Sequence, residues 1–194
     1  LGLAIGIGLM SLTVAVLWLL GSYHVLHTNP AADWAPAVLV VGVGAGLGEE
    51  ILFRGVLFRI VEEGLGTWWS LAISALFFGA VHLNNPGATL WSSLSIAIEA
   101  GILLGLLYHV TRSLWICVGM HLAWNVMQGT VFGIAVSGLP AHGFLVASLT
   151  GPTWLSGGGF GAEASVVALL LAIALRRGSI VPPSWKRRPP TTPA

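Results

Sequence analysis

The chain has 194 residues, of which 56% are hydrophobic and only 8% are charged. Its mean hydropathy is +0.89, whereas about a quarter of the residues in a soluble domain are charged. This composition excludes an ordinary water-soluble fold. The net charge of +1 excludes the basic field with which proteins capture nucleic acid. We therefore expect an integral membrane protein whose partner is the lipid bilayer.

Six apolar stretches approach the length of about 20 residues that a membrane-spanning helix needs. The first has no basic segment before it and is long enough to span, so we expect a helix there and not a cleavable signal peptide. The segment Phe144–Leu155 is interpreted as a loop or a re-entrant half-helix. The expected spans are Leu3–Tyr23, Pro36–Ile60, Trp68–Leu83, Leu90–Val110, Leu114–Val136 and Gly161–Leu175.

The distribution of basic residues predicts the orientation. With six spans, all eight Lys and Arg residues fall on or toward one side, and the opposite loops 27–35, 84–89 and 137–160 contain none. This asymmetry is typical of cytoplasmic N- and C-termini. We predict an all-α transmembrane bundle over residues 1–180 in a bacterial inner membrane. A proline-rich, basic and disordered tail is expected over residues 181–194.

Ionisable side chains at membrane depth are costly, so those that are retained mark candidate functional sites. Glu50 and Arg54 are four residues apart in the second span, so a helix puts them on one face, where they can pair. Glu49 is turned away from that face and is free to act as a general base. The alternative is a buried ion pair that only fixes helix packing. The ionisable residues within the expected spans include Glu49, Glu50, Arg54, His82, Glu99 and His121.

Two further motifs follow along the chain. His82 comes one turn after Phe78 near the end of the third span, and His121 and Asn125 lie one turn apart in the fifth. Two donors on one helix face can stabilise an oxyanion. The structural alternatives are a hydrogen-bonded histidine at a helix end and hydrogen bonds between helices. At the expected depths these side chains can converge around a small wet cavity.

The three motifs, Glu-Glu-x-x-x-Arg, Phe-x-x-x-His and His-x-x-x-Asn, together resemble those of the CPBP family of intramembrane proteases, which includes the Rce-type CAAX prenyl endopeptidase. The resemblance covers Gly48 to Asn125 and implies that Glu49 activates water, with His82 helping to hold it. It implies that His121 and Asn125 form the oxyanion site. Glu50 and Arg54 would then support and orient these groups.

We therefore expect an endopeptidase that cleaves a membrane-associated protein or peptide without a metal. A Zn²⁺ ion held by Glu49, His82 and His121 is the alternative mechanism. A scaffold or a proton-coupled transporter is the alternative function, although the sequence shows no inverted repeat. A structural role is expected for Glu99, and lining the cavity or pairing with a polar neighbour is the alternative. Residues outside the motifs to which we assign no catalytic role are Cys117, His24, His27, His109 and His142.

Overall fold

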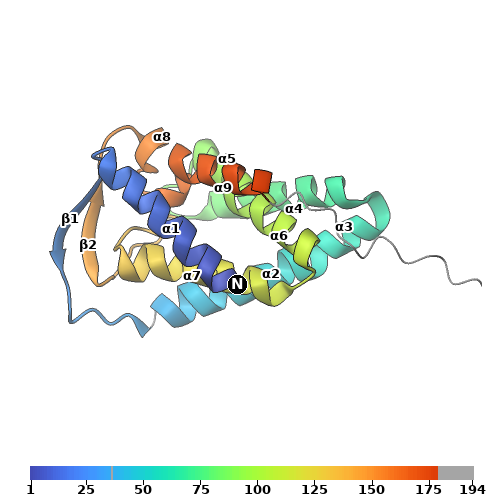
Figure 1. Ribbon diagram of the computed structural model, residues 1–194, viewed down its shortest axis with the longest axis horizontal. Coiled ribbons are helices and arrows are strands. Elements are labelled where there is room, and N and C mark those ends of the chain that lie inside the picture. The colour runs from blue at the N-terminus through green and yellow to red at the C-terminus, as the bar shows by residue number, and fades with distance from the viewer. Residues whose placement is uncertain (36, 179–194) are drawn as a thin grey trace, which may run out of the picture.

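The computed structural model describes residues 1–35 and 37–178, and most of this chain is helical. Long helices lie side by side along the long axis of the molecule (Figure 1). The elements η1, η2, η4 and η5 are π-helical, whereas η3 and η6 are short 3-10 turns. In chain order the helical elements are α1 (Gly2–Leu19), η1 (Ala37–Gly44), α2 (Ala45–Glu50), η2 (Ile51–Leu57), α3 (Phe58–Leu65), α4 (Thr67–Val81), η3 (His82–Asn84), α5 (Leu90–Ile96), η4 (Ala97–Ile102), α6 (Leu103–Thr111), α7 (Leu114–Asn125), η5 (Val126–Val131), α8 (Thr153–Ser156), η6 (Ala162–Ala164) and α9 (Val166–Gly178).

Consecutive elements join into longer helices that overlap the six predicted stretches, although the first and fifth end earlier and the sixth begins later than predicted. Two of these helices, Gly2–Leu19 and Leu90–Thr111, are long and apolar enough to cross a membrane by length and composition. The crossing of the bilayer by all six, and the cytoplasmic location of the termini, stay predictions. The predicted disordered tail at residues 181–194 lies outside the described residues. The continuous helices cover residues 2–19, 37–65, 67–84, 90–111, 114–131 and 166–178.

The prediction of an all-α fold is wrong in one region. Strands β1 (Tyr23–Thr28) and β2 (Leu145–Leu149) form an antiparallel pair at one end of the bundle (Figure 1). Helix α1 ends at Leu19, before the predicted end of the first span, and Gly21 turns the chain with a φ of 70°. Aromatic and β-branched residues are common in β1, and such residues favour strands. The segment 144–155 therefore holds a strand and the short helix α8, not a re-entrant half-helix.

The outer surface of the bundle is apolar, as a lipid-facing surface must be. Many large hydrophobic side chains are exposed along the helices, including Leu39, Leu76 and Leu170. Exposed tryptophans lie near helix ends, where an amphipathic ring suits the boundary between lipid and water. These tryptophans are Trp18 near the end of α1, Trp68 and Trp69 at the start of α4, and Trp115 at the start of α7.

At the end of the bundle opposite the sheet, an ion pair ties α3 to the end of α6. Arg112 donates two hydrogen bonds to the Glu62 carboxylate, at 2.5 and 2.9 Å. The Glu62 carboxyl also accepts a hydrogen bond from Thr67. The bonds from Arg112 hold the pKa of Glu62 below its ordinary value. The pair lies on the side that the distribution of basic residues predicts to be cytoplasmic.

Helix α1 packs closely on α7 because it presents glycines to it. A Cβ atom on Gly6 would meet the backbone of α7 at Met120, whereas a Cβ on Gly8 would meet open space. Small residues at such positions let two helix backbones approach, which is a common way of packing helices in membranes. The contact fixes α7, which carries His121 and Asn125, against the N-terminal helix.

We predict that Gly6→Leu lowers the melting temperature of the purified protein in detergent, because the added side chain forces α1 away from α7. Overpacking of this kind costs about 1–3 kcal/mol. Gly8→Leu on the same helix is the matched control and should melt at the wild-type temperature or slightly above it, since leucine favours helix over glycine. Equal melting temperatures for the two variants would contradict this packing.

The six-span topology predicts that the two ends of the bundle lie on opposite sides of the membrane. Gly64→Cys in α3 and Ala31→Cys after β1 place exposed thiols at these ends. In inverted inner-membrane vesicles, an impermeant maleimide should label Gly64→Cys and not Ala31→Cys, and intact spheroplasts should show the reverse. Cys117 is buried, so the wild-type protein provides the unlabelled control. Labelling of both positions from one side would refute the topology.

Candidate active site

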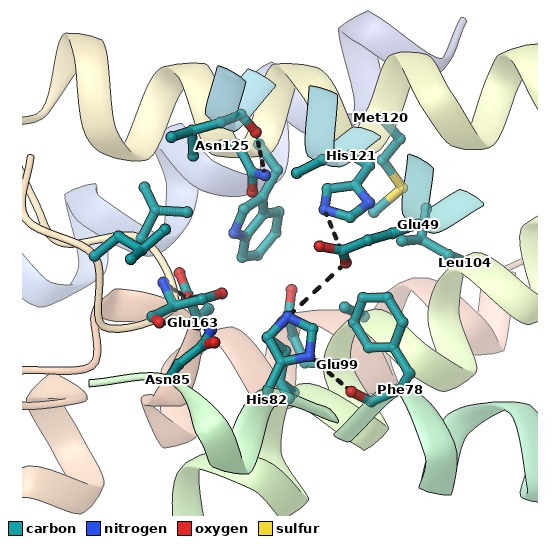
Figure 2. A pocket seen from close by; sticks show the side chains of 18 residues that line it. Glu49, Phe78, His82, Asn85, Glu99, Leu104, Met120, His121, Asn125 and Glu163 are labelled. Carbon is teal, nitrogen blue, oxygen red and sulfur yellow. Dashed lines mark hydrogen bonds and ion pairs between the residues drawn. The ribbon is translucent and has the colours of Figure 1, made fainter. Parts of the chain in front are cut away.

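All four predicted catalytic residues line one cavity of about 180 Å³ inside the bundle (Figure 2). A volume of this size admits several water molecules. Glu49 enters from α2, His82 from η3, and His121 and Asn125 from α7. The other residues that line it are Val41, Ala45, Phe78, Asn85, Ile96, Glu99, Ala100, Leu104, Met120, Trp124, Val136, Ser137, Leu139 and Glu163. The three motifs thus converge, although their helices are far apart in the sequence.

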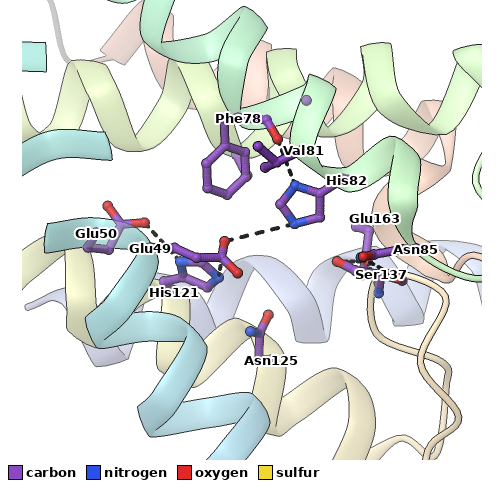
Figure 3. A network of polar contacts seen from close by, with 12 residues as sticks. Glu49, Glu50, Phe78, Val81, His82, Asn85, His121, Asn125, Ser137 and Glu163 are labelled. Carbon is purple, nitrogen blue, oxygen red and sulfur yellow. Dashed lines mark hydrogen bonds and ion pairs between the residues drawn. The ribbon is translucent and has the colours of Figure 1, made fainter. Parts of the chain in front are cut away.

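One oxygen of Glu49 is the point on which the two histidines converge (Figure 3). Glu49 Oε2 lies 3.8 Å from His82 Nε2 and 3.9 Å from His121 Nε2. These distances exceed that of a direct hydrogen bond. The oxygen itself is buried and has no hydrogen-bond partner. The three atoms therefore surround a space in which one small polar molecule can contact all of them.

The second nitrogen of each histidine fixes which way its ring faces. His82 Nδ1 lies 2.7 Å from the carbonyl oxygen of Phe78, and His121 Nδ1 lies 2.8 Å from Glu50 Oε1. A carbonyl and a carboxylate can only accept, so we assign the proton to Nδ1 in both rings. In the neutral state both Nε2 atoms then present a lone pair toward Glu49.

Behind His121 lies the ion pair that the i,i+4 spacing predicts. Arg54 Nη1 donates to Glu50 Oε1 at 2.9 Å, and both side chains are fully buried. Arg54 Nη2 also donates to the carbonyl oxygens of Ala100 and Gly101, at 2.9 and 3.1 Å. The guanidinium lies over the ring of Phe78, 4.7 Å from its centre. Glu50 and Arg54 do not line the cavity, so they act on it through residues that do, namely His121, Phe78 and Ala100.

Asn125 faces the cavity from one turn beyond His121. Its Nδ2 donates to the carbonyl oxygen of Val41 in η1, at 2.9 Å. An amide nitrogen carries two N–H groups, so this bond uses one donor and leaves the other. The contact also ties α7 to η1, whose wide π-helical turn supplies the acceptor.

One known family matches this sequence. A family model described as type II CAAX prenyl endopeptidase Rce1-like matches residues 31–127, which is half of the chain. The matched region contains all three motifs. The chain belongs to the Rce1-like family. No curated protein and no solved structure matches it.

Membership of the Rce1-like family makes this chain a membrane protein and a protease. The matched residues end at residue 127, so the family model does not cover α1, the β-sheet or α9. The polar groups that line the cavity from beyond residue 127 are therefore known from the structure alone.

Four polar residues that line the cavity were given no site role by the sequence reasoning, or only a structural one. Glu163 was counted as part of the sixth apolar stretch, where a lone carboxylate was the signal that could have found it. Asn85 and Ser137 were assigned to loops. Glu99 was expected to be structural, with cavity lining as the alternative, and it lines the cavity and is 2% exposed.

The side chains that we left unassigned lie outside this cavity. Cys117 is fully buried, and its Sγ donates to the carbonyl oxygen of Leu104 in α6 at 3.6 Å. His24 lies on β1 beside Thr150, and His109 lies 3.4 Å from Glu62. His142 lines a separate outer groove that adjoins Asn125.

The zinc alternative requires Glu49, His82 and His121 as ligands. Among the described residues, no group of three His, Cys, Asp or Glu side chains is arranged to hold a metal ion. Glu49, His82 and His121 do not form such a group in this structure.

We predict that Arg54→Leu destabilises the protein strongly, because it leaves the buried Glu50 carboxylate without its cation. Breaking one partner of a buried pair costs about 3–5 kcal/mol. The readout is the melting temperature in detergent together with the yield of folded protein. Arg59→Leu is the matched control, since Arg59 lies on the next helical stretch and is exposed. Equal stability of the two variants would show that the pair does not hold the fold.

Proposed function

We propose that this chain is an intramembrane endopeptidase that hydrolyses a peptide bond with a water molecule activated by Glu49, without a metal. The observation that carries the proposal is the position of Glu49 Oε2, which lies within 4 Å of two histidine Nε2 atoms. A carboxylate with one buried oxygen beside two oriented imidazoles is a typical arrangement for acid–base chemistry.

The water would lie between Glu49 and His82. A separation of 3.8 Å between two acceptor atoms is too long for direct contact but suits a molecule that donates to both. The proton on His82 Nδ1, which faces Phe78, keeps the Nε2 lone pair directed at this position. His82 therefore orients the water, and Glu49 accepts the proton that the water loses.

The oxyanion would form on the side of α7. When protonated, His121 Nε2 is a donor, and Glu50 at 2.8 Å from Nδ1 stabilises the positive charge. The second N–H of Asn125 is the other donor. Removing one oxyanion donor from a hydrolase typically costs about 10²–10³ in kcat.

The proton balance closes on Glu49. As the water oxygen bonds to the carbonyl carbon, one water proton passes to the Glu49 carboxylate. When the C–N bond breaks, Glu49 returns that proton to the leaving amine, and the acid product keeps the second oxygen. No serine or cysteine nucleophile takes part, so no acyl-enzyme forms.

The substrate that we propose is a membrane-associated protein or peptide, cleaved during maturation or the processing of a sorting signal. The apolar exterior of the bundle and the position of the cavity within it favour a substrate that reaches the site from the membrane. Farnesylated CAAX peptides are the first probe because of the family to which the chain belongs. N-palmitoylated, internally quenched peptides form the second set.

We predict that Glu49→Gln lowers kcat on whichever of these peptides is cleaved by about 10²–10⁴-fold, because the amide cannot accept the water proton. His82→Ala and His121→Ala should each lower kcat by about 10²-fold or more. The protein is assayed in lipid nanodiscs. Glu63→Gln, an exposed carboxylate on α3, is the matched control and should cleave like the wild type. Equal cleavage by wild type and Glu49→Gln would sink the mechanism.

The same samples decide the metal question. We expect no stoichiometric zinc by elemental analysis and no loss of activity after dialysis against a chelator. One zinc ion per chain, with activity lost on chelation and restored by Zn²⁺, would replace the metal-free mechanism with the zinc-dependent one.

A further inference from the structure

The cavity has a second set of carboxyl groups, apart from Glu49. Glu99 from η4 and Glu163 from η6 both line it, and each is only 2% exposed (Figure 2). We call these two residues the acidic end of the cavity. Because both carboxyl groups line the same cavity of about 180 Å³, their like charges repel each other when both are ionised. Neither belongs to the three motifs.

Glu163 is held as a fixed acceptor. Its Oε1 accepts from the backbone N–H and from the hydroxyl of Ser137, the latter at 3.0 Å. Its Oε2 accepts from Gln128 Nε2, and Gln128 is fully buried. Asn85 donates to the carbonyl oxygen of Ser137 at 2.9 Å. These contacts hold Ser137 at a φ of 49°, a conformation that costs free energy in a residue other than glycine.

Glu99 differs from Glu163 because no side chain satisfies it. No hydrogen bond to its carboxyl occurs among the described residues, although the group is almost fully buried and lines the cavity. A buried carboxylate without a donor is costly unless a charged or hydrogen-bonding partner meets it. The described part of the chain supplies no such partner.

The charges around the cavity point to a cation as that partner. Three carboxyl groups line the cavity, whereas no Lys or Arg is among the described residues that line it. Arg54, the nearest buried cation, is shared between Glu50 and two backbone carbonyls. A cavity with acidic walls and little water attracts positive charge strongly.

We propose that the acidic end of the cavity is a substrate subsite that binds a cationic group of the peptide, an ammonium or guanidinium, between Glu99 and Glu163. The proposal rests on the proposed function, because the cation is taken to belong to the peptide that is cleaved. Glu163 supplies a fixed acceptor, and Glu99 supplies the unpartnered one. Both are specificity-determining residues and take no part in proton transfer from water.

The size of the cavity limits where that cation can lie in the peptide. Glu49 and the acidic end line the same space of about 180 Å³. The Lys or Arg must therefore lie within one or two residues of the cleaved bond, or the cation must be a free α-amino group at a similar distance. Other positions along the peptide should show no preference.

The test measures binding and does not require cleavage. N-palmitoylated peptides in which an uncharged, uncleavable alkene replaces the amide bond carry Lys, norleucine or Glu at successive positions around that bond, and their affinities for the full chain are measured in phosphatidylcholine nanodiscs. A shorter set that lacks the palmitoyl group, with a free or acetylated N-terminus, shows whether the α-amino group is the cation. We expect wild type to bind Lys at least tenfold more tightly than norleucine at one position, and Glu least tightly.

The variants assign the effect to the acidic end. Glu99→Gln keeps the shape of the side chain and disturbs no hydrogen bond, so the preference for Lys should fall to threefold or less while norleucine binds unchanged. Glu163→Gln should reduce it as well. Glu63→Gln, outside the cavity, should retain the full preference. Substrates of wild type should show the same preference as a change in KM, with kcat largely unaffected.

Equal affinities of wild type for Lys and norleucine at every position, or a full preference in Glu99→Gln, would overturn the subsite. So would the loss of the preference when phosphatidylethanolamine is added, because the cation would then come from a lipid. A preference for Lys with no cleavage of any peptide would support the subsite and count against the proposed function. Cleavage without any preference for Lys would support the proposed function and overturn the subsite.

Discussion

The buried contact among Arg54, Glu50 and His121 is the interaction on which the rest of the site depends. Two fully buried charges persist in an apolar bundle only if each is compensated by the other and by hydrogen bonds. Arg54, which lies in η2, meets this requirement by pairing with Glu50 of α2 and by donating to a carbonyl oxygen of η4. Its guanidinium also lies over the Phe78 ring. Glu50 extends the chain of contacts to α7 through His121. The helices that carry the three motifs are thereby locked together at the depth of the catalytic groups.

The π-helical turns explain how a bundle of straight helices can supply so many contacts at one place. Such turns widen the helix and often occur at functional sites. The carbonyl oxygens that accept from Arg54 belong to η4, and the carbonyl that accepts from Asn125 belongs to η1. Gln128, which donates to Glu163, lies in η5. Each departure from the regular α-helix thus coincides with a polar contact of the cavity or its supports.

The sequence predicted what depends on spacing along one helix. The four-residue spacing of Glu50 and Arg54 placed them in contact, and the polarity of His82 and Asn125 in apolar stretches marked them as site candidates. The contacts of Glu163 were beyond that reasoning, because they join residues 26 and 35 positions apart through a loop. The β-sheet was missed for the same reason, since its strands are separated by more than a hundred residues and neither stands out alone.

The charge balance of the cavity limits how His121 acts in the proposed reaction. Three carboxyl groups, those of Glu49, Glu99 and Glu163, line the cavity. An oxyanion that forms there therefore adds negative charge beside other negative groups, which is electrostatically unfavourable. A neutral His121 whose Nδ1 donates to Glu50 presents only a lone pair at Nε2, which would repel that oxyanion. A proton on Nε2 turns the repulsion into a hydrogen bond, and Glu50 stabilises the resulting cation. A substrate cation between Glu99 and Glu163 would offset part of the remaining negative charge as soon as the peptide binds, equally before and during the reaction, so the proposed subsite would act on the choice of peptide and not on kcat.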